Sequence, residues 1–217
     1  MKSLTAAALL LTMFLSVPTA RAEWKMLDVP GIKPNVFTVA GGEITVDSRM
    51  GASFLYRAAT PAERDAAILS WRWRVDRAIP ATDLTAPGAD DRELAVHLWF
   101  PGPPEGAGLL RRFKDTLTAA LGYPVPGRTL TYVWGGKGAR GVMFANPHNA
   151  PDGQMVILRP GGTPTGRWFT ERIDFAADFR RAFGTAPPPL GYLAVSGDSD
   201  DTGGVCMGHL ADLRFGA

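Results

Sequence analysis

The sequence predicts a mainly β protein, a jelly-roll-like antiparallel β-sandwich with two or three short helices. Glycine and proline supply 43 of the 217 residues, and so many turn formers leave little room for helices. Apolar and polar residues alternate along 68–75 and 93–100, which is the period of a half-buried strand. About nine short strand-like segments occur along the chain, and that number favours a two-sheet sandwich.

Residues 1–22 have the features of a cleavable signal peptide. Lys2 gives a positive start, an apolar run follows over 4–17, and 20–22 form an A-x-A cleavage site. We expect cleavage before Glu23 and a periplasmic or secreted product. The apolar run is shorter than the ~20 residues that cross a bilayer, so no membrane span is predicted.

The mature chain, 23–217, is expected to form a single β-sandwich domain. Its charge is balanced, because losing Lys2 and Arg21 from 23 basic residues leaves 21 against 21 acidic ones. That balance argues against nucleic acid or an anionic membrane surface as a partner. The single cysteine, Cys206, lies far from the cleavage site and cannot form an internal disulfide, so neither a lipid anchor nor a disulfide framework is expected.

Two long strand candidates indicate which side chains face the core. Strand 68–75 places one apolar set inward and turns Arg72 and Arg74 outward; the inward set is Leu69, Trp71, Trp73 and Val75. Strand 93–100 turns His97 and Trp99 outward, and its inward set is Leu94, Val96, Leu98 and Phe100. The further strand candidates are 37–39, 44–46, 53–56, 129–134, 155–158, 192–196 and 210–215.

Helical spacing appears in only two or three places. Apolar residues recur on one helical face over 109–121, and again over 174–183, where Gly184 suits a left-handed cap. Thr60 and Glu63 have the spacing of a capping box that begins one further turn of helix.

The segment 136–141, G-K-G-A-R-G, matches the dinucleotide-binding fingerprint in letters only. In that motif the glycines open a helix, whereas here an apolar stretch leads directly into Asn146-Pro147. A phosphate-binding loop also fails, because Gly138 follows the lysine where Ser or Thr is required. The segment is therefore predicted to be a hairpin loop.

Three carboxylates crowd the segment 198–204, D-S-D-D-T-G-G. Asp198, Asp200 and Asp201 repel one another unless a cation, a basic side chain or water relieves them, and their spacing suits calcium. An EF-hand is excluded, since His209 stands where its glutamate ligand belongs. The alternative is a solvated turn in which Asp and Thr side chains accept hydrogen bonds from backbone amides.

Strand parity also suggests a ligand-binding face. If strands 68–75 and 93–100 pair, then Trp99 and His97 share one sheet face with Arg72 and Arg74. An aromatic plate beside guanidinium and imidazole donors suits a sugar or a small anion. The alternative is that a loop or helix of the chain itself covers Trp99.

No catalytic motif selects an enzyme class. The three histidines are far apart, which makes a zinc site unexpected, no Ser lies in a G-x-S-x-G elbow, and Cys206 is expected in the core. Glycoside hydrolysis needs only two carboxylates that meet in space. The possible members considered are Asp91, Glu93, Glu171 and Asp178.

The order of several segments resembles a known family. These segments are L-S-W-R-W-R-V at 69–75, Asp90-Asp91, T-L-T-Y-V-W at 129–134, Asn146-Pro147, Arg167-Trp168, 178–184 and D-S-D-D-T-G at 198–203. The chain resembles the bacterial family of domain of unknown function 3047 over nearly all of its mature length. That resemblance implies no activity and no catalytic residue. The strand order is also similar to that of galactose-binding-like and carbohydrate-binding jelly-roll modules.

Together these features lead us to expect an exported, non-enzymatic module that binds a glycan or another polar small ligand. Two other classes stay open. A cell-envelope glycan hydrolase would bring two carboxylates together in a cleft, and an envelope assembly or interaction protein would show a flat apolar patch.

Overall fold

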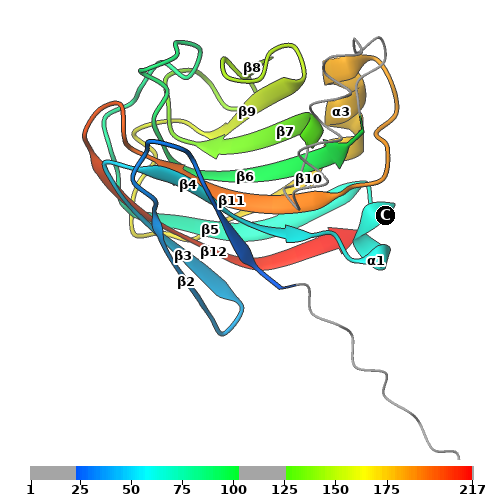
Figure 1. Ribbon diagram of the computed structural model, residues 1–217, viewed down its shortest axis with the longest axis horizontal. Coiled ribbons are helices and arrows are strands. Elements are labelled where there is room, and N and C mark those ends of the chain that lie inside the picture. Colours follow the sequence, from blue (N-terminus) through cyan, green and yellow to red (C-terminus); the bar gives the residue numbers. More distant parts are fainter. Residues whose placement is uncertain (1–22, 103–125, 217) are drawn as a thin grey trace, which may run out of the picture.

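The computed structural model describes residues 23–102 and 126–216. Two stacked sheets form a jelly-roll-like β-sandwich, as predicted (Figure 1). The predicted signal peptide and the predicted helix 109–121 lie outside the described residues. The seven-stranded sheet has the order β1 (Lys25–Asp28), β4 (Ala52–Ala58), β11 (Tyr192–Asp198), β6 (Arg92–Pro101), β7 (Pro126–Trp134), β9 (Gly153–Arg159), β8 (Met143–Ala145). The five-stranded sheet has the order β10 (Phe169–Asp174), β5 (Ile68–Arg77), β12 (Val205–Gly216), β3 (Glu43–Arg49), β2 (Val36–Ala40).

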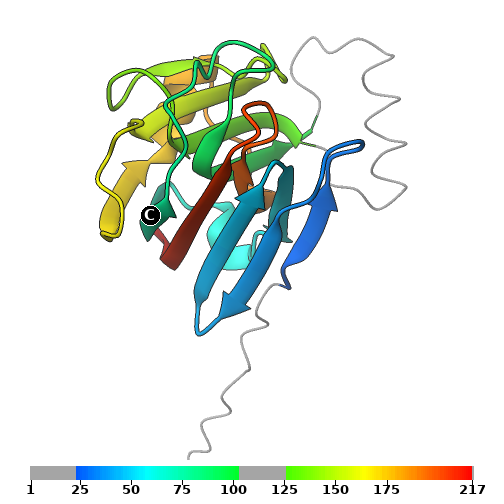
Figure 2. The same ribbon diagram turned by 90° about the vertical axis from the view of Figure 1, so that its left-hand side faces the viewer.

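Strand pairing is antiparallel throughout the described residues except between β7 and β9, which run parallel. Strands that are far apart in sequence therefore lie side by side. Figure 2 shows one case, with the C-terminal β12 next to β3 near the other end of the chain.

The core lies between the two sheets and is rich in aromatic rings. Trp71 and Trp73, predicted to face inward, are almost fully buried. The two rings meet edge to face at 5.3 Å, and Trp73 makes a similar contact with Trp134 of β7 at 5.6 Å. The alternation in strand 68–75 therefore identified the core side of β5 correctly.

The two described helices begin where the sequence predicts, and the second also ends there. Thr60 and Glu63 form the capping box of α1 (Pro61–Arg64). The carboxylate of Asp174 accepts a hydrogen bond from the backbone N–H of Ala177 at the start of α3 (Phe175–Phe183), and Gly184 ends that helix with a φ of +72°.

Three strands were not predicted, each for a different reason. The short β1 and β8 are edge strands with no clear alternation. The third, β10, turns Glu171 into the core, where a charged residue hides the pattern. Glu171 is stabilised there because Trp73 Nε1 donates to it at 3.1 Å and Arg140 and Arg159 pair with it.

The segment 136–141 is a loop with no helix after it, but it is not the predicted hairpin loop, because the strands on either side of it, β7 and β8, both pair with β9 and not with each other. Its backbone approaches a neighbouring loop so closely that a Cβ on Gly136 would lie 2.3 Å from Leu84 Cδ1. The φ of Gly136 is also positive, at +75°. Close packing therefore accounts for this glycine without any nucleotide.

The outer face of the seven-stranded sheet is partly covered by loops. A second apolar cluster forms there between sheet and loops, consisting of Leu84, Ala95, Val133, Met155 and Ile157, with Phe144 packed against it. Strand β6 is therefore buried on both faces from Arg92 to Phe100. The cavity described next lies on this same face.

Candidate functional site

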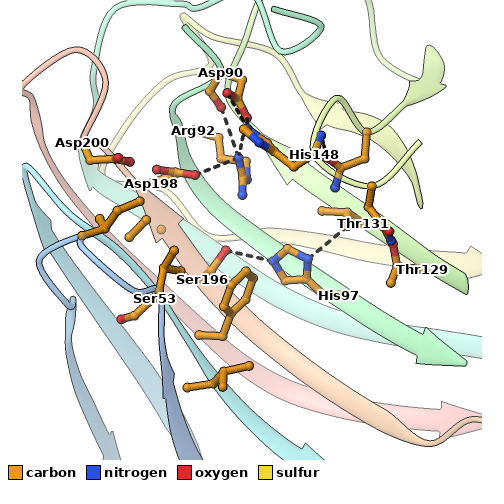
Figure 3. A pocket seen from close by; sticks show the side chains of 18 of the residues that line it. Ser53, Asp90, Arg92, His97, Thr129, Thr131, His148, Ser196, Asp198 and Asp200 are labelled. Carbon is orange, nitrogen blue, oxygen red and sulfur yellow. Dashed lines mark hydrogen bonds and ion pairs between the residues drawn. The ribbon is translucent and has the colours of Figure 1, made fainter. Parts of the chain in front are cut away.

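A cavity of about 490 Å³ opens on the outer face of the seven-stranded sheet (Figure 3). Its floor consists of side chains from the three central strands β11, β6 and β7, namely Ser196, His97, Trp99, Thr129 and Thr131. One wall is apolar and is formed by Leu27, Val29, Ile32 and Phe54, and the opposite wall is formed by Asn146, His148 and Asn149. The remaining end is charged and contains Asp90, Arg92, Asp198, Asp200 and Asp201.

His97 lies at the centre of the floor between two hydroxyl groups. Its Nε2 is hydrogen-bonded to Ser196 Oγ at 2.8 Å and its Nδ1 to Thr131 Oγ1 at 3.0 Å (Figure 3). Burial, assisted by the positive charge of Arg92, lowers the pKa of His97 well below its usual value. The imidazole is therefore neutral at physiological pH.

Arg92 organises the charged end of the cavity. Its Nη1 lies 3.0 Å from Asp198 Oδ2 and 3.5 Å from Asp90 Oδ2, so one guanidinium lies between two carboxylates (Figure 3). Asp90 also contacts His148 Nε2 at 3.0 Å. This arrangement ties the segment before β6 to β11 and to the loop that precedes β9.

The pKa of Asp198 is raised even though the positive charge of Arg92 lies beside it. Burial raises its pKa to about 8, and the neighbouring Asp200 and Asp91 add to this rise, while Arg92 opposes it. Its Oδ1 is buried without a hydrogen-bond partner among the described residues. The carboxyl group therefore takes up a proton more readily than an ordinary aspartate.

The predicted calcium trio is grouped differently in the structure. Among the described residues the carboxylates that lie within 4.8 Å of one another belong to Asp91, Asp198 and Asp200. Asp201 instead donates its backbone N–H to Asp91, and Thr202 does the same. The backbone amides of the turn are thus capped from outside the segment, by Asp91, and calcium binding stays a prediction.

Trp99 does not form the open aromatic plate that strand parity suggested. It lines the cavity but is only 5% exposed, because other rings of the chain pack around it. Phe54 and Tyr56 from β4 lie 5.8 Å away, and Tyr192 from β11 lies 6.2 Å away. A ligand in the cavity therefore meets an edge of this aromatic cluster.

The predicted pairing of strands 68–75 and 93–100 is wrong, because β5 and β6 belong to different sheets. Arg72 and Arg74 consequently lie on the far side of the sandwich from His97 and Trp99. They flank a different tryptophan, Trp168, at 5.1 and 5.0 Å from its ring centre. Their charges are already paired, with Asp212 for Arg72 and with Asp76 for Arg74.

The four carboxylates considered for glycoside hydrolysis do not line the cavity. Glu171 is paired inside the core, and Asp178 accepts a hydrogen bond from the hydroxyl of Tyr132 at 3.0 Å. Asp91 accepts the amides of the turn after β11. Glu93 is buried beneath a loop, and this burial raises its pKa to about 7.

Sequence reasoning identified only part of this site. Parity on one strand placed His97 and Trp99 on the correct face, but Ser196, Thr131, Asp90 and His148 come from other segments. The alternation in 192–196 was a possible signal for Ser196. No local pattern marks His148, which reaches Asp90 only because β9 runs parallel to β7 and brings the preceding loop beside β6.

No helix within the described ranges is long and apolar enough to cross a membrane. Three solved structures illustrate what the chain is similar to. The xyloglucanase domain of NopAA, a type three effector from Sinorhizobium fredii, in complex with cellobiose, is 8% identical over 86% of this chain and 89% of that chain, with a TM-score of 0.47. The family 11 xylanase from Neocallimastix patriciarum is 10% identical over 89% and 100%, with a TM-score of 0.37. Endoglucanase 3 of family GH12 from Trichoderma harzianum is 10% identical over 90% and 99%, with a TM-score of 0.39.

None of these alignments reaches a TM-score of 0.5, so the fold assignment rests on the sheet order itself. No curated protein matches the chain. A family model matches residues 22–214, which is nearly the whole of the predicted mature sequence, and the segments noted above fall within that range. The chain therefore belongs to the family described as protein of unknown function (DUF3047).

Proposed function

We propose that this exported protein is a binding module whose cavity holds a glycan or another polar small ligand. The observation that carries the proposal is the composition of one cavity, in which an apolar wall faces a wall of amide and imidazole groups. A sugar presents an apolar ring face and hydroxyl groups around its edge. The two kinds of wall complement these two kinds of surface.

The size of the cavity agrees with such a ligand. A volume of about 490 Å³ falls inside the ~300–1,000 Å³ range of small-molecule sites. The floor is rigid, because its residues lie on adjacent hydrogen-bonded strands in the middle of the seven-stranded sheet. Such a floor holds its hydroxyl and imidazole groups in place before a ligand arrives, which limits the entropy lost on binding.

A glycan hydrolase is less well supported. Asp90 and Asp198 do converge in the cavity, as hydrolysis by two carboxylates requires. The guanidinium of Arg92 lies between them, however, in the space that the glycosidic bond would have to enter. An assembly protein is also less well supported, since the site is a concave polar cavity rather than a flat apolar patch.

Binding to a glycan array, followed by titration calorimetry of each hit, tests the proposal. His148→Ala is the informative variant, because the side chain is 60% exposed and its removal should leave the fold intact. We expect about a tenfold loss of affinity, the value of one lost hydrogen bond. Arg49→Ala on β3 of the other sheet is the matched control and should bind like the unmodified protein.

The absence of any hit on the array would contradict the proposal. So would hits that bind both variants as tightly as the unmodified protein, because the ligand would then lie elsewhere. Release of reducing ends that is lost in Asp198→Asn would instead establish the hydrolase.

A further inference from the structure

The floor of the cavity contains a serine, a histidine and a threonine that are joined by hydrogen bonds in one row. Ser196 Oγ is hydrogen-bonded to His97 Nε2 at 2.8 Å, and His97 Nδ1 is hydrogen-bonded to Thr131 Oγ1 at 3.0 Å. The three residues come from the adjacent strands β11, β6 and β7. All three line the cavity, so a ligand that enters it lies against the serine hydroxyl.

This row fulfils the geometric conditions for an activated serine. A serine hydroxyl is a weak nucleophile until a neighbouring base takes its proton, and a third group must hold the base in the correct orientation. Such groups recur on unrelated folds and are recognised by their geometry, not by their order in the sequence. The missing G-x-S-x-G motif therefore does not exclude a serine nucleophile on a strand.

We propose that Ser196 is the nucleophile and His97 the general base of an ester hydrolase that removes acyl groups from an O-acylated sugar. The proposal rests on the proposed function, because the sugar must first bind in the cavity. Thr131 is a positioning residue, which accepts the Nδ1–H of His97 and so leaves Nε2 free to accept the serine proton.

The reaction balances with water as the only co-reactant. Ser196 Oγ bonds to the ester carbonyl carbon while its proton passes to His97 Nε2. The carbonyl carbon–sugar oxygen bond then breaks, and His97 returns the proton to the departing sugar hydroxyl. Water attacks the acyl-serine, the Oγ–carbon bond breaks with proton transfer through His97, and a carboxylic acid leaves.

The surrounding charges suit this chemistry. The Arg92 guanidinium lies on the same cavity, where its N–H groups can stabilise the oxyanion that forms on the ester carbonyl. The base is also in the required state, since burial keeps His97 neutral at physiological pH. A free carboxylate ligand is disfavoured by the acidic residues at this end, whereas a neutral ester is not.

Two measurements on the unmodified protein test the nucleophile without any substitution. Phenylmethylsulfonyl fluoride should add one sulfonyl group to the protein, and peptide mass spectrometry should place it on Ser196. The protein should also release acetate from an O-acetylated oligosaccharide and 4-nitrophenol from 4-nitrophenyl acetate. Labelling that is absent, or that occurs on another residue, would overturn the assignment of Ser196.

Substitutions then separate the roles. Ser196→Ala and His97→Gln should each lower kcat/KM for acetate release by a factor on the order of 10³ or more. Thr131→Val should lower kcat more than KM, and Thr131→Ser should restore most of the activity because it keeps the hydroxyl. If Thr131→Val is as active as the unmodified protein, Thr131 does not position His97. Circular dichroism should show that each variant is folded.

The pH profile gives an independent test of the base. The titratable and charged groups around the cavity are Arg92 on the same strand, Asp198 from β11, Asp90 before β6, His148 from the loop before β9, and Asp200 and Asp201 from the turn after β11. Burial holds the pKa of His97 well below its usual value. The rate should therefore remain level well below pH ~6.5, where an ordinary histidine gains its proton. A pH profile that is the same in His97→Gln as in the unmodified protein would exclude His97 as the base.

The failure of this proposal is distinguishable from the failure of the binding proposal. Glycan binding without acyl release or labelling would overturn the esterase and leave the binding module. Ser196-dependent hydrolysis of 4-nitrophenyl acetate without glycan binding would overturn the sugar substrate and confirm the nucleophile. Neither binding nor labelling would overturn both.

Discussion

Burial on both faces of β6 determines the charge state of its residues at the scale of single side chains. His97 is neutral because a charged imidazole loses its hydration there, and Glu93 keeps its proton to a higher pH for the same reason. The pKa of Glu93 rises to about 7, and its Oε2 has no hydrogen-bond partner among the described residues. A buried carboxylate of this kind lowers the stability of the fold once it ionises.

Glu93→Gln should therefore stabilise the protein at alkaline pH only. The folded pKa lies above the unfolded one, so the contribution of Glu93 is favourable at acid pH and is lost as the pH rises from about 4.5 through about 7. At about 1.4 kcal/mol per pKa unit, the free energy of unfolding of the variant should exceed that of the unmodified protein by roughly 3 kcal/mol above pH 7 and by little below pH 4.5. Urea unfolding at the two pH values measures this, with the exposed Glu23→Gln as control. Equal gains at both pH values would contradict the explanation.

Trp99→Ala should destabilise the fold by about 3–5 kcal/mol, the cost of emptying a large buried site. The expectation follows from its 5% exposure beneath Phe54, Tyr56 and Tyr192. Trp168→Ala is the control, because that ring is only half-buried beside Arg72 and Arg74 and should cost less. Urea unfolding measures the free energy lost in both variants. A loss in Trp99→Ala no larger than that in Trp168→Ala would show that Trp99 is not part of the packed structure.

At the scale of elements, local sequence patterns predicted which face of a strand is buried and where a helix begins, but not which strands pair. Alternation in 68–75 and 93–100 correctly gave the sides of β5 and β6 that face the core between the two sheets. The same alternation cannot say which strands pair, since every half-buried strand has it. Arg72 and Trp99 were therefore placed together, whereas the structure separates them by the thickness of the sandwich. Glu171 could not be recognised as a core residue from the sequence, because the ion pairs with Arg140 and Arg159 that stabilise it form only in the folded protein.

The turn between β11 and β12 carries the calcium prediction. If calcium binds only the folded protein through Asp91, Asp198 and Asp200, its addition should raise the melting temperature. At a hundredfold excess over Kd the gain is about 2.7 kcal/mol, and Asp200→Asn should reduce it. Asp47→Asn, on β3 of the other sheet, is the control. A melting temperature that is the same in chelator and in millimolar calcium would contradict calcium binding. The turn would then be stabilised by the hydrogen bonds that Asp91 accepts from its backbone amides.

At the scale of the whole molecule, the site could not be read from any one segment. The sheet order β4–β11–β6–β7 joins strands that are distant in the chain, and only this order brings Ser196, His97 and Thr131 into one row. The composition did predict the class of fold, because many turns and short alternating strands have few other compact solutions.

Export remains a prediction about the whole chain. The positive start, the apolar run and the A-x-A site over 1–22 predict cleavage before Glu23. Intact-mass measurement of protein from a periplasmic fraction should give a chain that begins at Glu23. Full-length protein confined to the cytoplasm would contradict this.

The parallel pairing of β7 with β9 has a consequence for how this family can diversify. Parallel strands cannot be joined by a tight hairpin, so the chain must return across the sheet before β9 begins. That return path, 135–152, supplies Asn146, His148 and Asn149 to the cavity while the floor belongs to the sheet. Loops tolerate substitution and insertion far better than central strands. Substitutions in this wall can therefore change which ligand the cavity binds, while the residues of the floor stay the same.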